Sequence, residues 1–456
     1  MTIDSTTRAL VVGMGSSGIA AVKLLKKLGA AVAVSDSRSS TDLDQALLRR
    51  LRDQQIEVET DGHAADFFSL ANLVVVSPGV PLDLPVLEQC RKHGVPVVGE
   101  MSLAAEYLKT PMVAVTGTNG KSTVVTLLGE MFAAANKKVF VGGNIGIPLA
   151  EYVCGSQDAE VVVVEVSSFQ LDTAPGFRPD VAVLLNISPD HLDRYSSYDE
   201  YAASKLSIFA AQDKDDSVVL NVDDSEIMDR LEGKTGGRKF YYGTELAGDQ
   251  NGIAIDHMTL KMKGLGSVEE KYELTGSSLN QEPNIHNAMA AVLAARLLNC
   301  PTYAVQQALT SYKKLDHRMT LVAEIRGVKY VDDSKGTNIG AVRAALEGMD
   351  RPVVLIGGGR DKGGDYGFLK EIVRAKVKSM LLIGEAATKM ADYFAKDTQT
   401  EACHSLPEAV CRASVIAEPG DVVLLSPACA SFDMFTSYSQ RGDVFRSAVM
   451  KLVGNE

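Results

Sequence analysis

Residues 115–123, Val-Thr-Gly-Thr-Asn-Gly-Lys-Ser-Thr, have the types and spacing to bind a phosphate. Glycines let backbone N–H groups curl around a phosphate, the lysine could reach its outer oxygens, and the serine could ligate Mg²⁺. A glycine-rich turn used only for packing is the alternative, and Val115 stands where the usual phosphate loop has its first glycine. The run Gly-Lys-Ser-Thr favours a nucleoside triphosphate site. Its predicted contacts are Gly117, Thr118, Asn119, Gly120, Lys121, Ser122 and Thr123.

A second glycine loop, Gly13-Met14-Gly15-Ser16-Ser17-Gly18, lies between an apolar run and a helix-period stretch, and Asp36 ends the next apolar run. Taken alone this is the dinucleotide fingerprint, in which the acid binds a ribose hydroxyl. A close helix–strand crossing and a nicotinamide enzyme are both open readings. A dehydrogenase has no use for the triphosphate loop, whereas the pyrophosphate of a UDP-sugar would also suit this second loop.

Two polar residues follow apolar runs where metal ligands could stand. Glu165 comes directly after Val161–Val164, and His191 lies in the loop after Val181–Leu185. The carboxyl end of a parallel strand points into the crevice where ligands bind, and Mg²⁺ prefers oxygen ligands. A solvated acid and a hydrogen-bonded loop histidine are the alternatives.

Lys205 lies on the apolar stripe of a predicted helix. Ser197 and Glu200 form a possible capping box, which predicts a helix beginning near Tyr198. A lysine that faces inward loses hydration, which favours the reactive neutral amine. Such an amine can add CO₂ to become a carbamate with two anionic oxygens, although a lysine can also extend outward along its helix.

The elements that must position these residues are strands alternating with helices, which predicts an α/β fold with parallel sheets. The 456 residues are enough for about three domains at roughly 150 residues each. We predict a Rossmann-like domain at 1–108, a central phosphate-loop domain at 109–299, and a Rossmann-like domain at 300–456. The expected strands are Ala9–Val12, Ala31–Ser35, Leu73–Val76, Val95–Val98, Met112–Val115, Val161–Val166, Val181–Leu185, Val353–Ile356, Met380–Ile383 and Val422–Leu425, with alternating residues between Lys239 and Leu274 and a helix over Ile285–Leu298.

Composition excludes several classes of protein. The net charge of -12 disfavours general nucleic-acid binding, because an acidic surface repels a phosphate backbone. No apolar run reaches the ~18 residues of a membrane helix, and the N-terminus lacks a signal-peptide pattern. The six cysteines are scattered without a CxxC pair, which indicates reduced thiols. We therefore expect a cytoplasmic protein without membrane insertion.

These motifs resemble the central domain of the muramoyl ligases of peptidoglycan synthesis. The matching residues are Thr116–Thr123, Glu165–Ser168, Asp190–Asp193 and Lys205. The resemblance implies ATP and two Mg²⁺ ions, one held by His191 and a carbamate on Lys205, the other by Glu165 and Ser122. It also implies that Lys121, His191, Lys205 and Arg318 are catalytic. Further implied ATP contacts are Asn284, Asn287, Arg318 and Asp333.

Four stretches resemble the member that adds D-glutamate: Asp36–Arg38, Gly143–Gly146, Gly357–Gly363 and Ser426–Asp433. Sequences typical of the members that add diaminopimelate or alanine are absent. The resemblance implies an amide between UDP-N-acetylmuramoyl-L-alanine and D-glutamate through an acyl phosphate, made by a monomer.

Two sets of implied substrate contacts follow. For the UDP substrate they are Ser16, Ser17, Asp36, Ser37, Arg38, Ser77, Gly79, Asn144, Ser167 and Gln170. For D-glutamate they are Lys335, Thr337, Lys362, Ser431, Phe432 and Tyr438. Tyr438 stands where the family is expected to have phenylalanine. From the residues themselves, Lys335 and Lys362 could supply the fixed cations that a dianionic amino acid needs, or they could be surface charge.

Overall fold

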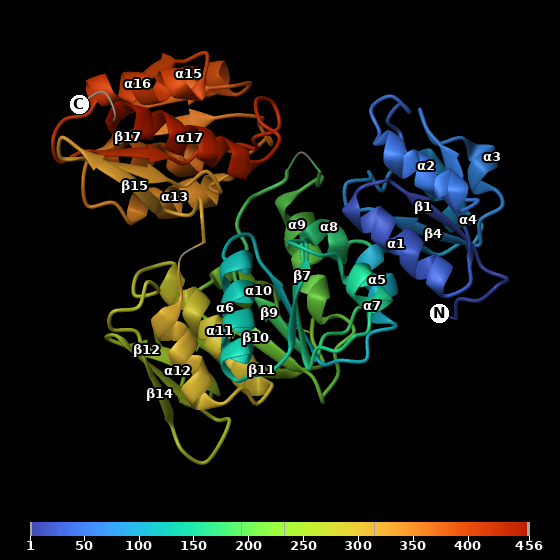
Figure 1. Ribbon diagram of the computed structural model, residues 1–456. Coiled ribbons are helices and arrows are strands. Elements are labelled where there is room, and N and C mark those ends of the chain that lie inside the picture. Colours follow the sequence, from blue (N-terminus) through green and yellow to red (C-terminus); the bar gives the residue numbers. More distant parts are fainter. Residues whose placement is uncertain (1, 193, 232, 314, 454–456) are drawn as a thin grey trace. The chain divides into compact units, whose positions relative to one another are not determined.

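A computed structural model describes residues 2–192, 194–231, 233–313 and 315–453. In this part of the chain the strands form three sheets, of five, nine and six strands, and helices flank them (Figure 1). The expected α/β class with largely parallel sheets is confirmed. The described chain divides into two compact units, which are Met1–Asn186, Ala203–Ser277 and His286–Ser311 for the first, and Ile187–Ala202, Ser278–Ile285 and Tyr312–Glu456 for the second.

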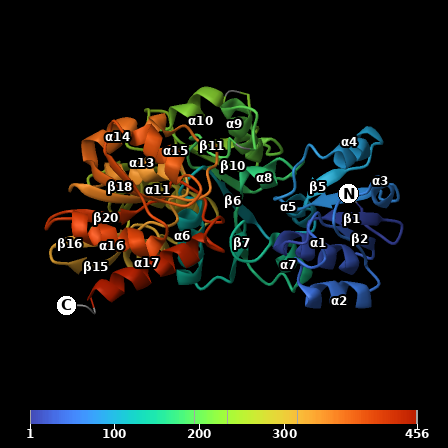
Figure 2. The ribbon, with the colours of Figure 1, turned by 90° about the horizontal axis from the view of Figure 1, so that it is seen from above.

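The first sheet, in the first unit, is parallel with the order β3-β2-β1-β4-β5. Helix α4 lies on one side of it and α1 and α2 lie on the other (Figure 2). Its strands are β1 Arg8–Val12, β2 Ala31–Ser35, β3 Glu57–Glu59, β4 Leu73–Val76 and β5 Val97–Gly99. Its helices are α1 Ser16–Lys27, α2 Gln45–Asp53, α3 Ala65–Phe68, α4 Pro85–Lys92 and α5 Glu100–Ala105.

The central sheet, also in the first unit, has the order β14-β13-β12-β11-β10-β9-β6-β8-β7, and β13 and β14 are its antiparallel end. Its strands are β6 Met112–Thr116, β7 Val139–Gly143, β8 Val161–Glu165, β9 Val181–Leu184, β10 Ser217–Asn221, β11 Arg238–Gly243, β12 Gly252–Asp256, β13 Thr259–Lys263 and β14 Glu270–Glu273. Its helices are α6 Lys121–Ala134, α7 Leu149–Cys154, α8 Ser168–Leu171, α9 Tyr198–Leu206, η1 Ser207–Phe209, α10 Ser225–Arg230, α11 Asn284–Leu297 and α12 Thr302–Ser311. Strand β6 lies between β8 and β9 and is buried throughout, which explains its uninterrupted apolar run.

The C-terminal sheet, in the second unit, has the order β15-β16-β20-β17-β18-β19, with β15 antiparallel at one edge. Alternate residues of β17 enter two cores, one under α13, α14 and α15 and the other under α16 and α17. Its strands are β15 Thr320–Ile325, β16 Val328–Asp332, β17 Val353–Gly358, β18 Val377–Ile383, β19 Gln399–Ala402 and β20 Val422–Leu425. Its helices are α13 Ile339–Glu347, η2 Tyr366–Leu369, α14 Lys370–Lys376, α15 Ala387–Phe394, α16 Leu406–Ile416 and α17 Tyr438–Val453.

The predicted strands are present, with ends that differ by a few residues. The predicted strand at Val95–Val98 is β5, Val97–Gly99, and the predicted helix at Ile285–Leu298 is α11, Asn284–Leu297. The helix predicted near Tyr198 begins at that residue, and Ser197 Oγ accepts the Glu200 N–H as expected. The Glu200 carboxylate, however, accepts from the N–H and hydroxyl of Ser196 rather than from Ser197, so the capping box is incomplete.

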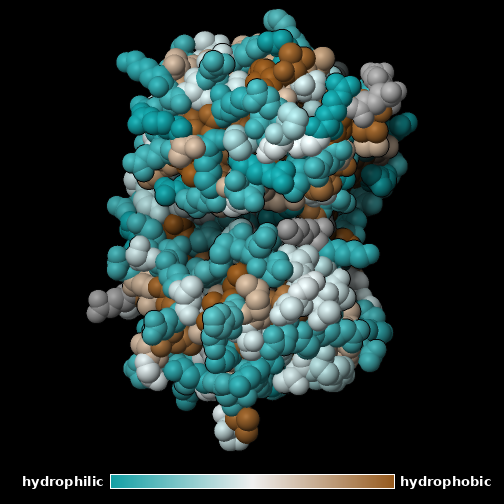
Figure 3. Space-filling view, turned by 90° about the vertical axis from the view of Figure 1, so that its left-hand side faces the viewer, coloured by the Kyte–Doolittle hydropathy of each residue, from teal (hydrophilic) through white to brown (hydrophobic). Residues whose placement is uncertain are grey.

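The surface is largely hydrophilic on the face that Figure 3 shows, and its hydrophobic residues form small separate groups. None of the helices within the described residues is long and apolar enough to span a bilayer. The cysteines are all free thiols, as the sequence predicts.

Glu100, the first residue of α5, is a buried carboxyl group that should make stability depend on pH. Its Oε1 accepts the Ala150 N–H at 2.6 Å, and its Oε2 has no hydrogen-bond partner among the described residues. Burial raises the pKa of Glu100 from 4.5 to about 7. When folding raises the pKa of an acid, the folded protein loses stability as the pH rises from the pKa of the unfolded state to that of the folded state. For Glu100 this range is about 4.5 to 7.

When the pH rises from 5 to 8, the free energy of unfolding of Glu100→Gln should therefore increase by about 3 kcal/mol relative to that of the wild type. Urea unfolding of both proteins at the two pH values measures this difference. Glu106→Gln, at an exposed position on the same segment, serves as the control and should leave the pH dependence unchanged. An unchanged dependence in Glu100→Gln would contradict the expectation.

Candidate active site

The phosphate loop connects β6 to α6 and requires glycine at two positions. Gly117 and Gly120 have φ values of +151° and +88°, which other residues rarely adopt. A Cβ on Gly120 would lie 2.3 Å from Oδ1 of Asn287. The predicted ATP contact Asn287 therefore lies directly against the loop.

Asn186, which follows β9, holds the phosphate loop from the neighbouring strand. Its carbonyl oxygen accepts the Thr118 N–H at 3.0 Å. Its side chain accepts the Asn119 N–H at 2.8 Å and donates to the Asn119 carbonyl at 3.1 Å. These three bonds fix the loop at the carboxyl edge of the central sheet, where parallel sheets bind their ligands.

Two lysine ammonium groups converge on one carbonyl oxygen of this loop. Lys121 Nζ donates to Gly117 O at 2.7 Å and to Thr118 O at 2.9 Å. Lys205 Nζ donates to Gly117 O at 3.0 Å, and its side chain is only 2% exposed. The prediction that Lys205 faces inward is confirmed, because a lysine extending to solvent would be exposed. Two positive charges on the same carbonyl oxygen favour the binding of an anion at this point.

The oxygen ligands predicted for a metal ion lie beside the same loop. Ser122 Oγ donates to Glu165 Oε2 at 2.6 Å, and Asn144 Nδ2 donates to Glu165 Oε1 at 2.9 Å. Glu165 ends β8 and is 2% exposed. A buried carboxylate beside a hydroxyl, both at the phosphate loop, is a donor set suited to Mg²⁺.

The second glycine loop and Asp36 form a separate cluster at the carboxyl edge of the first sheet. Asp36 accepts the Met14 N–H at 2.7 Å and is bound in a two-pronged contact by the Arg38 guanidinium. Burial alone would raise the pKa of Asp36, but these hydrogen bonds lower it to about 2. Ser77 Oγ donates to Gly13 O at 2.9 Å. The acid thus binds the loop and the turn together.

Of the other residues predicted to contact the UDP substrate, Asn144, Ser167 and Gln170 belong to the central sheet. Asn144 contacts Glu165, as described above, and its backbone N–H also donates to the Glu165 carbonyl at 2.8 Å. Ser167 and Gln170 form a capping box at the start of α8. Ser16 and Ser17, which lie within the second glycine loop, are the first two residues of α1.

In the second unit, His317 and Asp333 are buried in polar contacts at the end of β16. His317 Nδ1 lies 2.7 Å from Asp332 Oδ2, which also accepts from Arg446 Nε at 3.0 Å. Asp333 accepts from Ser426 Oγ at 2.8 Å, and burial raises the pKa of Asp333 to about 7. The positive charge of Arg318 opposes that rise in the pKa of Asp333.

The residues predicted to contact the amino acid all belong to the second unit. Lys335 Nζ lies 4.0 Å from the centre of the Tyr438 ring, a cation–π contact. Thr337 and Lys362 line a narrow pocket of about 10 Å³ that also includes His191. Ser431 is buried at 2% exposure, whereas Phe432 is 65% exposed.

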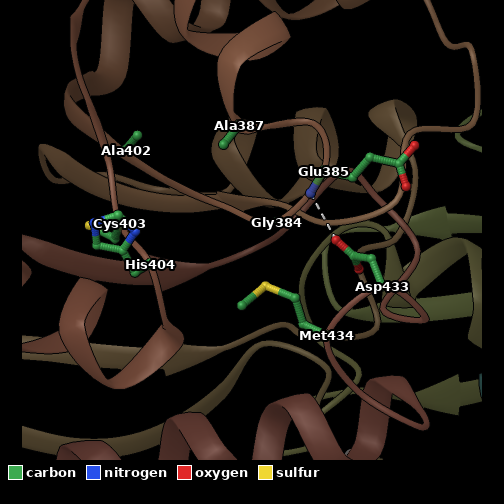
Figure 4. A pocket seen from close by; sticks show the side chains of 8 residues that line it. All are labelled: Gly384, Glu385, Ala387, Ala402, Cys403, His404, Asp433 and Met434. Carbon is green, nitrogen blue, oxygen red and sulfur yellow. Dashed lines mark hydrogen bonds between the residues drawn. The ribbon is translucent and has the colours of Figure 1, made fainter.

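A wider pocket of about 440 Å³ lies at the ends of β18 and β19 (Figure 4). Asp433 Oδ2 accepts the Glu385 N–H there at 2.9 Å. The lining residues are Gly384, Glu385, Ala387, Ala402, Cys403, His404, Asp433 and Met434. None of the predicted site residues is among them, so the size of a pocket does not by itself identify the active site.

Comparisons with known proteins agree with this arrangement of sheets and loops. Residues 7–99 match the N-terminal domain of the MurD-like Mur ligases, 115–295 the Mur ligase middle domain, and 317–429 the Mur ligase glutamate ligase domain. A UDP-N-acetylmuramoylalanine–D-glutamate ligase from Geobacter sp. (strain M21) is 44% identical over 97% of each chain. One of the same name from Syntrophotalea carbinolica is 41% identical over 99% of each chain.

The chain belongs to the Mur ligase family. Solved structures show the same fold at low sequence identity. A pseudomurein peptide ligase type C from Methanothermus fervidus is 19% identical with a TM-score of 0.61, and it is matched over 98% of this chain and 100% of its own. A MurF ligase from Thermotoga maritima in complex with ADP is 16% identical with a TM-score of 0.59, over 98% and 97%.

Within this Mur ligase, the structure brings Lys121, Ser122, Glu165, Lys205 and Asn287 together around the phosphate loop. His191 and Asn284 belong to the second unit, which also contains the residues predicted to contact D-glutamate. Asp193, the last residue of the motif that begins at Asp190, lies outside the described residues.

Sequence reasoning missed two residues that hold the Mur ligase site together, Asn186 and Arg441. Arg441 of α17 is fully buried at 0% exposure. It donates to Ser334 Oγ at 3.0 Å, to Ser334 O at 2.9 Å and to Cys429 O at 3.2 Å. Burial lowers the pKa of Arg441 to about 10, so it remains a cation at neutral pH. Most of its acceptors are backbone carbonyls, which leave no signal in the sequence.

Arg441→Met should lower the free energy of unfolding of the Mur ligase by about 3 kcal/mol, because it leaves buried carbonyl oxygens without donors. It should also weaken amino-acid binding, since the segments that carry Lys335 and Ser431 lose their common anchor. Chemical unfolding and the KM for the amino acid measure the two effects. Lys451→Met, at an exposed position on the same helix, should change stability by less than about 0.5 kcal/mol. Equal free energies of unfolding for the two variants would contradict a stabilising role of the hydrogen bonds that Arg441 donates.

Proposed function

We propose that this Mur ligase joins the L-alanine carboxylate of UDP-N-acetylmuramoyl-L-alanine to the amine of D-glutamate, with ATP converted to ADP and phosphate. The observation that carries the proposal is the cluster of Lys121, the Ser122–Glu165 pair and buried Lys205 around one phosphate loop. The choice of substrates is supported by curated relatives of that name, 41–44% identical over nearly the full chain.

The chemistry follows from the poor reactivity of a free carboxylate, whose leaving group would be oxide. Phosphorylation by ATP gives an acyl phosphate, which an amine can attack with release of phosphate. Negative charge spreads over the transferred phosphoryl group in the transition state, so positive groups fixed beside it accelerate the reaction. Lys121 and Arg318 have this role in the proposal, and Asn284, Asn287 and Asp333 bind the rest of the nucleotide.

The Ser122–Glu165 pair at the loop suits one Mg²⁺ ion, and the proposal includes a second ion. Ser122 and Glu165 offer oxygen donors at the loop, and a carbamate on Lys205 together with His191 would hold the second ion. Bound Mg²⁺ would neutralise the phosphate oxygens as charge develops. The burial of Lys205 beside Lys121 supports the carbamate, because carbamylation replaces a second positive charge with a negative one.

The remaining contacts divide between the three sheets. The first sheet binds the uridine diphosphate through the Ser16–Ser17 loop end, the Asp36–Arg38 turn and the Ser77–Gly79 segment. Asn144, Ser167 and Gln170 of the central sheet meet the muramoyl part. Lys335, Thr337, Lys362, Ser431, Phe432 and Tyr438 hold the carboxylates of D-glutamate. We further infer that the protein is cytoplasmic and monomeric. Light scattering of the purified protein tests the monomeric state.

A coupled assay tests the function directly. Purified protein is mixed with ATP, Mg²⁺, UDP-N-acetylmuramoyl-L-alanine and D-glutamate, and phosphate release is followed while mass spectrometry identifies the product. The expected result is phosphate release that requires both organic substrates and equals the amide formed. Release that is independent of either substrate would overturn the proposal. Replacing D-glutamate with L-alanine, L-lysine or diaminopimelate should abolish turnover, and turnover with one of them would assign a different amino acid.

A further inference from the structure

The narrow pocket in the second unit contains a carboxylate to which no role has been given, that of Asp190. The pocket is lined by Asp190, His191, Thr337, Asn338 and Lys362, among others. Thr337 and Lys362 are proposed above to hold the carboxylates of the amino acid. Asp190 is 8% exposed, so its charge is largely withdrawn from water. A buried carboxylate needs partners, and those partners indicate what it is placed to bind.

Asp190 is held on two sides and pairs loosely with a lysine on a third. Its Oδ1 accepts the His191 N–H at 2.9 Å, and its Oδ2 accepts from Asn338 Nδ2 at 3.0 Å. Lys362 Nζ lies 3.3 Å from Oδ1, and the imidazole Nε2 of His191 lies 3.6 Å from Oδ2. Both distances exceed the roughly 2.7–2.9 Å of a strong charge-assisted hydrogen bond. The neutral donors therefore fix the carboxylate, while the ion pair with Lys362 can be exchanged for other partners.

A second carboxylate in the same pocket, that of Asp361, is differently placed. Its Oδ2 lies 2.5 Å from Lys389 Nζ, and its Oδ1 accepts from the Gly363 N–H at 3.1 Å. Lys389 does not line the pocket within the described residues. Asp361 thus pairs with a lysine outside the pocket lining, whereas Asp190 pairs with Lys362, which lines the pocket and is proposed above to bind the substrate.

We propose that Asp190 is a specificity-determining residue that binds the amino group of the incoming amino acid while Lys362 binds one of its carboxylates. The Lys362 ammonium pairs with Asp190 as the ammonium of the substrate would, and the Asp190 carboxylate pairs with Lys362 as a carboxylate of the substrate would. When the amino acid enters, one internal ion pair is exchanged for two pairs with the substrate, so no buried charge is left without a partner. The pocket thereby selects an amino acid over a diacid that lacks an amine. This inference rests on the proposed function, because it takes D-glutamate as the ligand.

The test compares D-glutamate with glutarate, which has the same two carboxylates and no amine, in the wild type and in Asp190→Asn. The asparagine keeps an oxygen acceptor for Asn338 and removes the charge. The KM for D-glutamate should rise by about 10- to 100-fold, the loss expected for a hydrogen bond to a charged group. The inhibition constant of glutarate against D-glutamate should fall or stay unchanged, because Lys362 loses its internal competitor.

A rise in the KM for D-glutamate without a rise in the inhibition constant of glutarate distinguishes recognition of the amine from a structural role. If both constants rise by the same factor, Asp190 only maintains the pocket and the proposal is overturned, while the ligase function stands. A fall in kcat with the KM for D-glutamate unchanged would assign Asp190 to orienting His191 instead and also overturns it. A wild type without turnover that depends on D-glutamate would overturn the function itself, and this proposal with it.

Two further measurements cover a variant with little turnover. Calorimetric titration of folded Asp190→Asn with each ligand gives the same comparison without catalysis, and circular dichroism establishes that the variant is folded. Should Asp190→Asn fail to fold, Lys362→Met provides the reciprocal test, since it should weaken glutarate and D-glutamate alike. Weakening of D-glutamate alone in that variant would overturn the proposed pairing. Asp361→Asn makes the same charge change in the same pocket, and it should shift both ligands in the same direction.

Discussion

Lys205→Ala is expected to lower kcat by about 10³-fold, the upper range for removing one preorganised group that stabilises transition-state charge. Lys205 is buried and its Nζ lies 3.0 Å from the carbonyl oxygen of Gly117, in the turn that would bind the triphosphate. Alanine removes the amine that would be carbamylated and, with it, two anionic oxygens next to the phosphate loop. Initial rates at saturating substrates measure the loss.

Chemical rescue separates the proposed carbamate from a simple charge effect. Bicarbonate should not restore Lys205→Ala, since there is no amine to carbamylate, whereas short-chain carboxylic acids should restore part of the rate by occupying the space with a carboxylate. Lys214→Ala, at an exposed position in the same part of the chain, should keep full activity. Full activity of Lys205→Ala would remove the carbamate from the mechanism.

Lys121→Met is expected to have a comparably large effect, about 10²- to 10³-fold on kcat, with little change in the KM for the UDP substrate. Its ammonium donates to Gly117 O and Thr118 O of its own loop. A triphosphate bound at the loop offers more highly charged acceptors, so the lysine would turn to the phosphates, where negative charge develops during transfer. Single-turnover measurements of phosphate release test this effect on the chemical step.

The surface lysine of the Lys138–Asp158 ion pair provides a control for the loss of one positive charge. Lys138→Met should change kcat by less than about twofold, because exposed ion pairs contribute little. A fall in kcat for Lys138→Met as large as that for Lys121→Met would mean that overall charge, rather than the position of Lys121, decides the rate.

Patterns local in the chain predicted most of the fold. Strand β6 is buried on both faces, so its residues read as one apolar run, and the glycines after it require backbone angles that few other residues adopt. The inward position of Lys205 was also predictable, because helical spacing places it on the apolar stripe of α9. Short or partly exposed strands such as β3 and β7 were not predicted, since their apolar runs are at most three residues long.

Contacts between segments that are distant in the chain could not be predicted from such local patterns. Asn186 binds the phosphate loop 67 positions earlier in the chain, and Arg441 reaches Ser334 across 107 positions. The acceptors of Arg441 are mainly backbone carbonyls, which every residue type carries. The role of Asp190 could be inferred only from the fold, which places Lys362 and Asn338 beside it although they follow it by 172 and 148 positions in the chain.

The sequence by itself determined the elements and the kind of chemistry, because helix and strand periodicity, glycine-dependent turns and the donor groups of Lys121, Ser122 and Glu165 are properties of residue types at short spacing. The tertiary structure alone decided which charges pair. The pairing of Asp190 with Lys362 depends on distance and on exclusion from water, and both arise only when segments remote in the chain pack together.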